Sequence, residues 1–368
     1  MAAPIIQFGT SRFLQAHVDL MLSEAAAAGQ DVGRVTVVET TGSPASRARI
    51  AAFREGKPYP VRIRGLVDGK PVDEERQVSV ISDGLSARED AARLAALFAG
   101  PVSTVVSNTG DRGYDVPETP VPTLEGWSTF PELLTALLFH RFEAGGGGMT
   151  LFPCELVERN GARLAALVDA LAVRGGLPQA FRSWLAAECR FVDSLVDRIV
   201  SAPIEPVGAV AEPYALWAIR AMPGLVPPCR HTDIQVVDDL DFIERRKLFV
   251  LNLGHTLLAD RWLREGRRQD ETVREIIADP AVRAWLETIM RSEVIPAFGD
   301  RQDEIAAYFA VTLDRFANPF LDHRLADIAQ NHAAKIDRRA GGLVRFATST
   351  GHSSTFPMLG ATFPDIAG

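Results

Sequence analysis

The chain has 368 residues, more than a single hydrophobic core usually supports, so we expect two domains. With 47% hydrophobic and 23% charged residues, its composition is that of an ordinary globular protein. A formal net charge of -8 and the lack of a sustained lysine and arginine stripe argue against nucleic acid as a partner.

The N-terminal stretch predicts the first half of a dinucleotide-binding sheet. Residues 4–8 form a short apolar run, residues 13–28 an amphipathic stretch, and residues 35–38 a second apolar run. This is the β-α-β order of a Rossmann-type half. The turn at residues 9–11 would aim backbone N–H groups at a pyrophosphate, and the positive end of the following helix would add to the attraction.

Single residues around this turn refine the prediction. The glycine signal is weak by itself, because Ser11 takes the place of the usual second glycine and Leu14 that of the third. Arg12 adds a positive charge. Glu39 ends the second strand, where a carboxylate can accept hydrogen bonds from the adenosine ribose hydroxyls and repel a 2′-phosphate, which favours NAD over NADP. A solvated strand end is the alternative for Glu39.

The pattern continues through the first 200 residues. Residues 58–82 predict short strands joined by a turn at Asp68–Gly69, and residues 102–107 predict a buried strand that ends before Asn108 and Thr109. Ligands sit beyond the carboxyl ends of such strands, so these two residues are candidate nicotinamide contacts, with a turn-forming role as the alternative. The other elements expected here are helices at 87–99, 130–144 and 162–172, and a strand at 149–152.

After the prolines at 203 and 206, short strands give way to long helices. We therefore expect a dinucleotide-binding domain over residues 1–205 and a mainly helical substrate and catalytic domain over residues 206–368. The expected helices of the second domain are 241–264, 271–278, 281–291, 301–316 and 321–334.

The sequence predicts neither a metal centre nor a membrane segment. Cys154, Cys189 and Cys229 are widely separated, form no Cys-x2-Cys pair and are expected to be reduced, and the histidines show no compact ligand spacing. No apolar run approaches the roughly 18 to 20 residues that span a bilayer, and the N-terminus lacks a basic region followed by an apolar signal core. We expect a cytoplasmic protein.

Lys247, Asn252 and His255 lie within nine residues of an otherwise apolar run, where polar groups are costly to bury without a task. In a helix of about 100° per residue, all three can face one cleft. A desolvated lysine can take the proton of an alcohol as its carbon loses a hydride, while an amide N–H steadies the oxygen and an imidazole orients the substrate. The alternative is a core helix whose lysine reaches solvent and whose other polar groups are satisfied internally.

The pattern Lys-x4-Asn-x2-His resembles the signature of the long-chain mannitol dehydrogenase family, which includes polyol dehydrogenases and hexuronate reductases. The similarity runs from about residue 5 to about residue 340. Five further blocks stand in the order of the family: Gln7-Phe-Gly-Thr-Ser-Arg-Phe-Leu-Gln-Ala-His17, Val106-Ser-Asn-Thr109, Cys154-Glu-Leu-Val-Glu-Arg-Asn-Gly161, Val196-Asp-Arg-Ile199 and Arg315-Phe-Ala-Asn-Pro319.

The resemblance implies an α/β protein, with an N-terminal Rossmann-like doubly wound domain before a mainly α-helical one, and NAD-dependent, metal-independent oxidation of a secondary alcohol. Lys247 would be the general base. Asn252 and His255 would shape the oxyanion and substrate site, and Asp197 would hold a substrate hydroxyl or tune the charge of the lysine. The residues expected to bind the cofactor are Phe8, Gly9, Thr10, Ser11, Arg12, Phe13, Glu39, Asn108 and Thr109.

One departure concerns the substrate. Leu156 stands where mannitol-type members carry an oxyanion-hole asparagine, and the Cys154-Glu-Leu block is more similar to the tagaturonate reductase branch. A carboxylated substrate needs a cation, although each candidate could instead form a surface salt bridge. We expect a sugar alcohol or sugar acid as substrate and a monomer or homodimer; the rival is a catalytically silent NAD(H)-binding sensor. The candidate cations are Arg198, Arg315, Arg324, Lys335 and Arg338.

Overall fold

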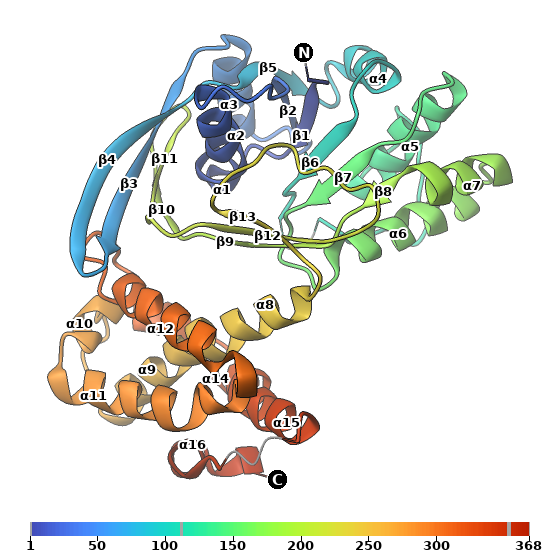
Figure 1. Cartoon of the computed structure of the whole chain (residues 1–368). Helices are drawn as coiled ribbons and strands as arrows, with labels where there is room; N and C mark the ends of the chain where they lie inside the picture. The colour runs from blue at the N-terminus through green and yellow to red at the C-terminus, as the bar shows by residue number, and fades with distance from the viewer. Residues whose placement is uncertain (1, 111–112, 352–354, 368) are drawn as a thin grey trace. The chain divides into compact units, whose positions relative to one another are not determined.

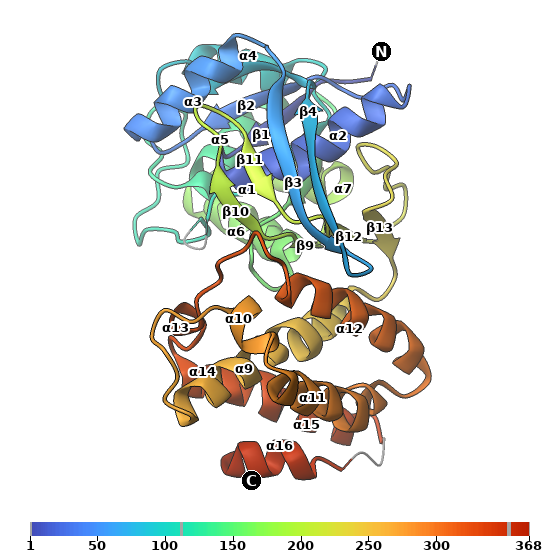
Figure 2. The ribbon, with the colours of Figure 1, turned by 90° about the vertical axis from the view of Figure 1, so that its left-hand side faces the viewer.

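The computed structural model describes residues 2–110, 113–351 and 355–367. The chain forms two compact units, which Figures 1 and 2 show from two sides. Unit 1 comprises Met1–Ile63, Glu74–Ala211 and Ala215–Leu240. Unit 2 comprises Arg64–Asp73, Glu212–Tyr214 and Asp241–Gly368.

Unit 1 is built on a six-stranded sheet in which neighbouring strands run parallel. Its strands are short apolar runs such as β1 and β2, which are buried along their whole length, as in a sheet covered on both faces. The predicted Rossmann-like sheet is confirmed. The strand order is β5 (Ile81–Ser86), β2 (Val35–Glu39), β1 (Ile5–Phe8), β6 (Thr104–Ser107), β7 (Thr150–Pro153) and β8 (Arg190–Phe191).

The helices of unit 1 pack around this sheet (Figure 1). The single helix expected over residues 13–28 is divided at His17, whose backbone is not helical (φ -125°, ψ -90°). The buried His17 ring lies with Nε2 2.9 Å from the carbonyl oxygen of Leu216, a contact that an uninterrupted amphipathic pattern does not reveal. The helices are α1 (Arg12–Ala16), α2 (Val18–Ala27), α3 (Pro44–Arg54), α4 (Ala91–Ala99), α5 (Phe130–Glu143), α6 (Asn160–Arg174) and α7 (Gln179–Glu188).

Two smaller sheets complete the β structure. One has the order β10 (Val200–Pro203), β11 (Ala209–Ala211), β3 (Tyr59–Val67) and β4 (Lys70–Val78), and the other β13 (Ile234–Val237), β12 (Leu216–Arg220) and β9 (Ser194–Asp197). Asp68 and Gly69, both with positive φ, make the turn expected between β3 and β4. The boundary expected at residues 205 and 206 falls inside unit 1, between β10 and β11, which pair with each other.

Unit 2 is mainly helical, as expected. Among its described residues, three segments are π-helical and interrupt what the sequence pattern presents as continuous α-helices. Gly254 allows a close approach of two helices, because a Cβ there would lie 2.9 Å from the ring of Phe316. The elements are α8 (Leu240–Arg246), η1 (Lys247–Asn252), α9 (Leu253–Arg264), α10 (Val273–Ile277), α11 (Pro280–Ile289), η2 (Met290–Val294), η3 (Pro296–Arg301), α12 (Gln302–Phe316), α13 (Leu325–Ile328), α14 (His332–Ile336), η4 (Asp337–Gly341), α15 (Gly342–Ser349), α16 (Pro357–Thr362) and η5 (Pro364–Ala367).

A carboxyl group lies in the core of unit 1. Asp19 on α2 is fully buried, and its Oδ2 accepts hydrogen bonds from Tyr59 Oη at 2.9 Å and from Gln7 Nε2 at 3.3 Å. Burial outweighs both hydrogen bonds and raises the pKa of Asp19 from 3.8 to about 7. The folded state therefore holds this proton across a pH range in which the unfolded chain releases it.

We expect Asp19→Asn to remove a pH dependence of stability. Between about pH 4 and 7 the folded protein binds more protons at this site than the unfolded chain, so wild-type stability falls as the pH rises through that window. The asparagine cannot ionise, so at pH 8 the variant should be more stable than wild type by on the order of 2 to 4 kcal/mol. Urea unfolding at pH 5 and pH 8 measures this difference; equal pH slopes for the two proteins would contradict it.

Candidate active site

The candidate cofactor site lies where the order of the main sheet reverses, between β1 and β6. Gly9 follows β1 with φ +112°, and a Cβ at this position would lie 2.4 Å from the carbonyl oxygen of Asn108, which follows β6. Only glycine fits this turn. Open α/β sheets bind ligands beyond the carboxyl ends of the strands at such a reversal.

Side chains tie together the loops that follow β1, β6 and β7. Ser11 caps α1 by accepting a hydrogen bond from the N–H of Leu14 at 3.3 Å, and its Oγ donates to Asn108 Oδ1 at 3.2 Å. Asn108 Nδ2 in turn donates to the carbonyl oxygen of Cys154 at 2.7 Å. The structure therefore brings Gly9, Ser11 and Asn108 of the predicted set to one edge of the sheet.

Other members of that set differ in what they offer a ligand. The ring of Phe8 is fully buried against Phe98 and Phe130, with centroids 6.1 and 5.1 Å away, so only its backbone is left for a ligand. Phe13 stacks on the imidazole of His17 at 4.7 Å. Arg12 is exposed.

A basic residue on α3 was missed by the sequence reasoning. Arg49 Nε donates to the hydroxyl of Thr10 at 3.0 Å and so places a guanidinium at the loop after β1. Its signal in the sequence was only a basic residue in the helix that follows the second strand, which many surface helices share. Its position makes it a candidate partner for a phosphate.

Glu39 is not a solvated strand end. It is 3% exposed, and its Oε2 accepts from the N–H groups of Thr41 at 3.0 Å and Gly42 at 2.6 Å, while Oε1 accepts from the hydroxyl of Ser86 at 2.7 Å. The carboxylate thus orders the loop that follows β2. Each carboxylate oxygen has more than one acceptor site, so contact with a ribose stays a prediction.

Glu155, at the carboxyl end of β7, is the second residue that the sequence reasoning left without a role. Its Oε1 accepts from the N–H of Thr109 at 3.1 Å and from the Thr109 hydroxyl at 3.2 Å, while Oε2 accepts from Ser107 Oγ at 3.1 Å and Tyr114 Oη at 3.2 Å. Burial raises the pKa of Glu155 against the effect of these hydrogen bonds. Glu155 therefore fixes Thr109. Leu156, beside it, is 73% exposed.

Replacing Gly9 by alanine is expected to weaken NADH binding at least tenfold. The new Cβ meets the Asn108 carbonyl oxygen at 2.4 Å and forces the turn after β1 to move. Quenching of tryptophan fluorescence by NADH measures the affinity. Gly29→Ala is the matched control, because Gly29 also has a positive φ, +84°, but no atom within 4 Å of its Cβ position. NADH affinity that is equal in both variants would contradict the role of the turn.

In unit 2, Lys247 and Asn252 are the first and last residues of a π-helical turn. The sequence pattern predicts an α-helix here. The N–H of Leu253 bonds to the carbonyl oxygen of Leu248, five residues earlier. An α-helix separates residues five apart by about 140° round its axis, whereas the i→i+5 hydrogen bonding of a π-turn brings them closer together. Lys247 and Asn252 are both half-buried, and residues 249–251 are buried. The π-turn thus brings the backbone positions of Lys247 and Asn252 closer together round the helix axis than an α-helix would.

His255 follows on the first turn of α9 and is 8% exposed. Its ring lies 4.6 Å from the ring of Phe316 and 4.9 Å, edge to face, from that of His323. Burial lowers the pKa of His323, although the charge of Asp327 acts in the opposite direction. A neutral His323 therefore packs against His255.

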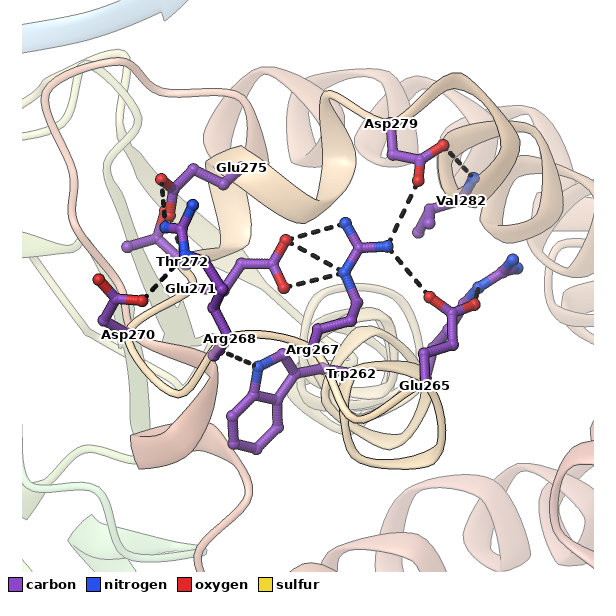
Figure 3. A network of polar contacts seen from close by, with 11 residues as sticks. Trp262, Glu265, Arg267, Arg268, Asp270, Glu271, Thr272, Glu275, Asp279 and Val282 are labelled. Atoms are coloured by element: carbon purple, nitrogen blue, oxygen red, sulfur yellow. Dashed lines mark hydrogen bonds and ion pairs between the residues drawn. The ribbon is translucent and has the colours of Figure 1, made fainter.

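The segment that carries His323 is anchored to the α9–α10 connection. The N–H of Val273 donates to the carbonyl oxygen of His323 at 2.9 Å. That connection is held by Arg267, whose guanidinium pairs with Glu271, Glu265 and Asp279 (Figure 3). The network of ion pairs thereby supports one wall of the His255 environment.

Arg339 of η4 contacts the turn that carries the signature. Its Nη1 donates to the carbonyl oxygen of Asn252 at 2.9 Å and to the hydroxyl of Thr256 at 2.7 Å. Thr256 Oγ1 also donates to the Asn252 carbonyl oxygen at 3.1 Å. Nothing in the sequence spacing pointed to Arg339, because the contact joins residues that lie 87 positions apart.

Asp197 ends strand β9 and is 5% exposed. It belongs to unit 1, whereas Lys247, Asn252 and His255 belong to unit 2. Its expected role beside the lysine stays a prediction.

The candidate cations for a substrate carboxylate differ in their hydrogen-bond partners and in their exposure. Arg315 is held by Glu212 through two hydrogen bonds, Nε to Oε2 at 3.0 Å and Nη2 to Oε1 at 2.8 Å. Arg198 is buried, and its Nη1 donates to the carbonyl oxygen of Ala16 at 2.7 Å. Arg324 is exposed. Lys335 donates to the carbonyl oxygen of Ile328 at 2.7 Å and has no carboxylate partner in the described part of the chain.

Within residues 2–110, 113–351 and 355–367, no group of three or more histidine, cysteine, aspartate or glutamate side chains is arranged to hold a metal ion. No helix in the same residues has the length and apolar character needed to cross a membrane. A cavity in unit 1 lies at the amino ends of β1, β6 and β7, the edge opposite to the candidate cofactor site.

Two family models match the chain. The mannitol dehydrogenase Rossmann domain matches residues 3–225, and the mannitol dehydrogenase C-terminal domain matches residues 239–355. The chain belongs to the mannitol dehydrogenase family. This family comprises NAD-dependent polyol and uronate oxidoreductases that act on CH–OH groups.

Several relatives within the mannitol dehydrogenase family are altronate oxidoreductases. That of Halalkalibacterium halodurans is 31% identical over 375 residues, which cover 96% of this chain and 72% of that protein. That of Klebsiella pneumoniae is 31% identical over 371 residues, covering 91% of this chain and 73% of that protein. That of Bacillus subtilis is 29% identical over 365 residues, with the same coverage.

Two solved structures share the fold. A substrate-free D-sorbitol dehydrogenase superposes with a TM-score of 0.82 at 21% identity and covers 96% of this chain and 78% of that one. The ternary complex of Pseudomonas fluorescens mannitol 2-dehydrogenase with NAD and D-mannitol superposes with a TM-score of 0.71 at 19% identity, covering 100% of this chain and 85% of that one. At these identities the likeness concerns the fold.

Proposed function

We propose that this member of the mannitol dehydrogenase family is an NAD-dependent, metal-independent dehydrogenase that interconverts a polyol or an aldonate with its keto sugar or keto acid. The observation that supports the proposal is the π-turn of unit 2, which brings the positions of Lys247 and Asn252 closer together round the helix axis just before His255. Polar groups are costly to bury in an apolar helix without a task, whereas alcohol oxidation uses a base for the hydroxyl proton and benefits from a donor to the developing oxyanion.

The residues at the reversal of the main sheet fit a dinucleotide. Any Cβ at position 9 would fill the space beside the turn after β1. A glycine is expected where the backbone must approach a pyrophosphate closely. Thr10 and Ser11 would contribute backbone N–H groups, Glu39 would accept from the ribose hydroxyls, and Asn108 with Thr109 would lie on the nicotinamide side. NAD, when bound, supplies the acceptor for the hydride.

Each side chain of the signature has one task. The Lys247 amine takes the proton of the substrate hydroxyl as its carbon is oxidised, and returns it in the reverse direction. The Asn252 amide donates a hydrogen bond to the oxygen on which negative charge develops. His255 orients the substrate. Asp197 holds a second substrate hydroxyl or balances the charge of the lysine.

A spectrophotometric screen tests this function. The purified chain is mixed with NADH and, in separate reactions, with tagaturonate, fructuronate, fructose and pentuloses, and absorbance at the NADH maximum is followed. Oxidation of NADH with at least one substrate, unchanged by a chelator, is the expected result. If NADH quenches tryptophan fluorescence but no substrate causes its oxidation, the chain is instead the catalytically silent sensor.

A further inference from the structure

Two cations of unit 2 are close to the signature and have no counter-ion among the residues that the structure describes. Lys335 on α14 and Arg339 on η4 are four residues apart, a spacing that puts side chains side by side on a helix. η4 packs against both η1 and α9, the segments that carry Lys247, Asn252 and His255. Arg339 reaches Asn252 directly, with Nη1 2.9 Å from its carbonyl oxygen.

Neither cation forms an ion pair with any residue that the structure describes. Asp337, the acidic residue nearest to them in the sequence, forms an ion pair with Arg345 instead, with Asp337 Oδ1 3.1 Å from Arg345 Nη1. Most other buried or half-buried arginines of unit 2 do have a carboxylate, for example Arg315 with Glu212 and Arg267 with Glu271. An uncompensated cation pair is thus specific to this place.

The surroundings of both cations disfavour their positive charge. Burial and the charge of Arg338 lower the pKa of Arg339, and burial together with the charge of Arg339 lowers the pKa of Lys335. His323, which lies against His255, has its pKa lowered by burial as well and supplies no negative charge. Half-buried cations that repel each other are costly unless an anion joins them.

We propose that Arg339 and Lys335 bind the carboxylate of the substrate and make the Lys247 site selective for sugar acids over neutral polyols. This inference rests on the proposed dehydrogenase function. Nη1 of Arg339 is taken by Asn252 and Thr256, which leaves Nε and Nη2 as a fork for two carboxylate oxygens. The same guanidinium holds the backbone of Asn252, so carboxylate binding and placement of the catalytic amide are joined in one residue.

The experiment compares an acid with its neutral analogue. The kcat and KM of the wild-type chain are measured for D-altronate with D-altritol and for D-mannonate with D-mannitol, with NAD saturating. We expect kcat/KM to be at least thirtyfold higher for the acid of one pair, and its KM to rise with NaCl while that of the alcohol does not.

Arg339→Gln should lower kcat/KM for the preferred acid about 30- to 100-fold, mainly through KM. It should lower kcat/KM for the alcohol clearly less, because both substrates lose the placement of Asn252 but only the acid also loses its cation. Arg339→Lys keeps the charge and should recover part of the loss. Arg291→Gln is the control, because Arg291 also lies on a π-helix but its side chain is 68% exposed. Lys335→Gln provides a second test if Arg339→Gln does not fold, as judged by its far-UV circular dichroism.

Two outcomes would overturn the inference and leave the dehydrogenase function intact. The first is equal kcat/KM for acids and alcohols in the wild type. The second is an equal loss of kcat/KM for both in Arg339→Gln, which would mean that Arg339 only positions Asn252. A wild-type chain that oxidises neither class would remove the proposed function itself. The two failures are therefore distinguishable.

Discussion

Lys247→Ala is expected to lower kcat at least a hundredfold, with little change in the affinity for NADH. The amine is the group that takes the substrate proton, and removal of a general base costs a factor of about 100 to 10,000. The residues that would hold the cofactor belong to unit 1, whereas Lys247 belongs to unit 2, so NADH binding should persist. Steady-state turnover and fluorescence titration with NADH measure the two effects.

Chemical rescue sharpens this test. Added ethylamine can enter the space left by the lysine side chain and should restore part of the turnover of Lys247→Ala, more strongly as the pH rises and more free amine is present. Lys57→Ala is the matched control, because the Lys57 side chain is 77% exposed and pairs with Glu55. Turnover of Lys247→Ala near that of wild type would exclude the lysine as the base.

Arg315→Met is expected to lower the free energy of unfolding by about 3 to 5 kcal/mol, the largest stability effect foreseen here. The side chains of Arg315 and Glu212 are only 3% and 2% exposed and share two hydrogen bonds. The guanidinium also lies 4.4 Å from the centre of the Tyr214 ring. Its removal leaves a buried carboxylate without its cation. Urea unfolding followed by circular dichroism measures the loss.

The double variant Arg315→Met, Glu212→Leu separates a lost attraction from a stranded charge. If the stranded carboxylate causes the loss, the double variant should regain most of the stability. Arg274→Met serves as the control, since its partner Asp322 is 73% exposed, and a change within about 0.5 kcal/mol is expected. If Arg315→Met also changed the free energy of unfolding by only about 0.5 kcal/mol, the ion pair would not support the fold.

The long helix expected over residues 241–264 shows where sequence reasoning reached its limit. Its apolar residues recur at a spacing that suits an α-helix, and the structure has helix throughout. The π-turn at Lys247–Asn252 adds no break in composition, no proline and no change of pattern. It is accommodated by packing against η2, η4 and α12, segments 40 to 90 residues away, and this packing is invisible to a local pattern.

Local signals were sufficient for the parallel sheet, the Gly9 turn, the Asp68–Gly69 turn and the family. Apolar runs of four or five residues and a glycine that must adopt positive φ depend on neighbours in the chain, so they can be recognised without the fold. The burial of Glu39, the role of Glu155 and the contact of Arg339 with Asn252 could be seen only in three dimensions. Each depends on hydrogen bonds whose partners come from other strands or helices, and the energy of a buried charge is determined by those partners rather than by its place in the sequence.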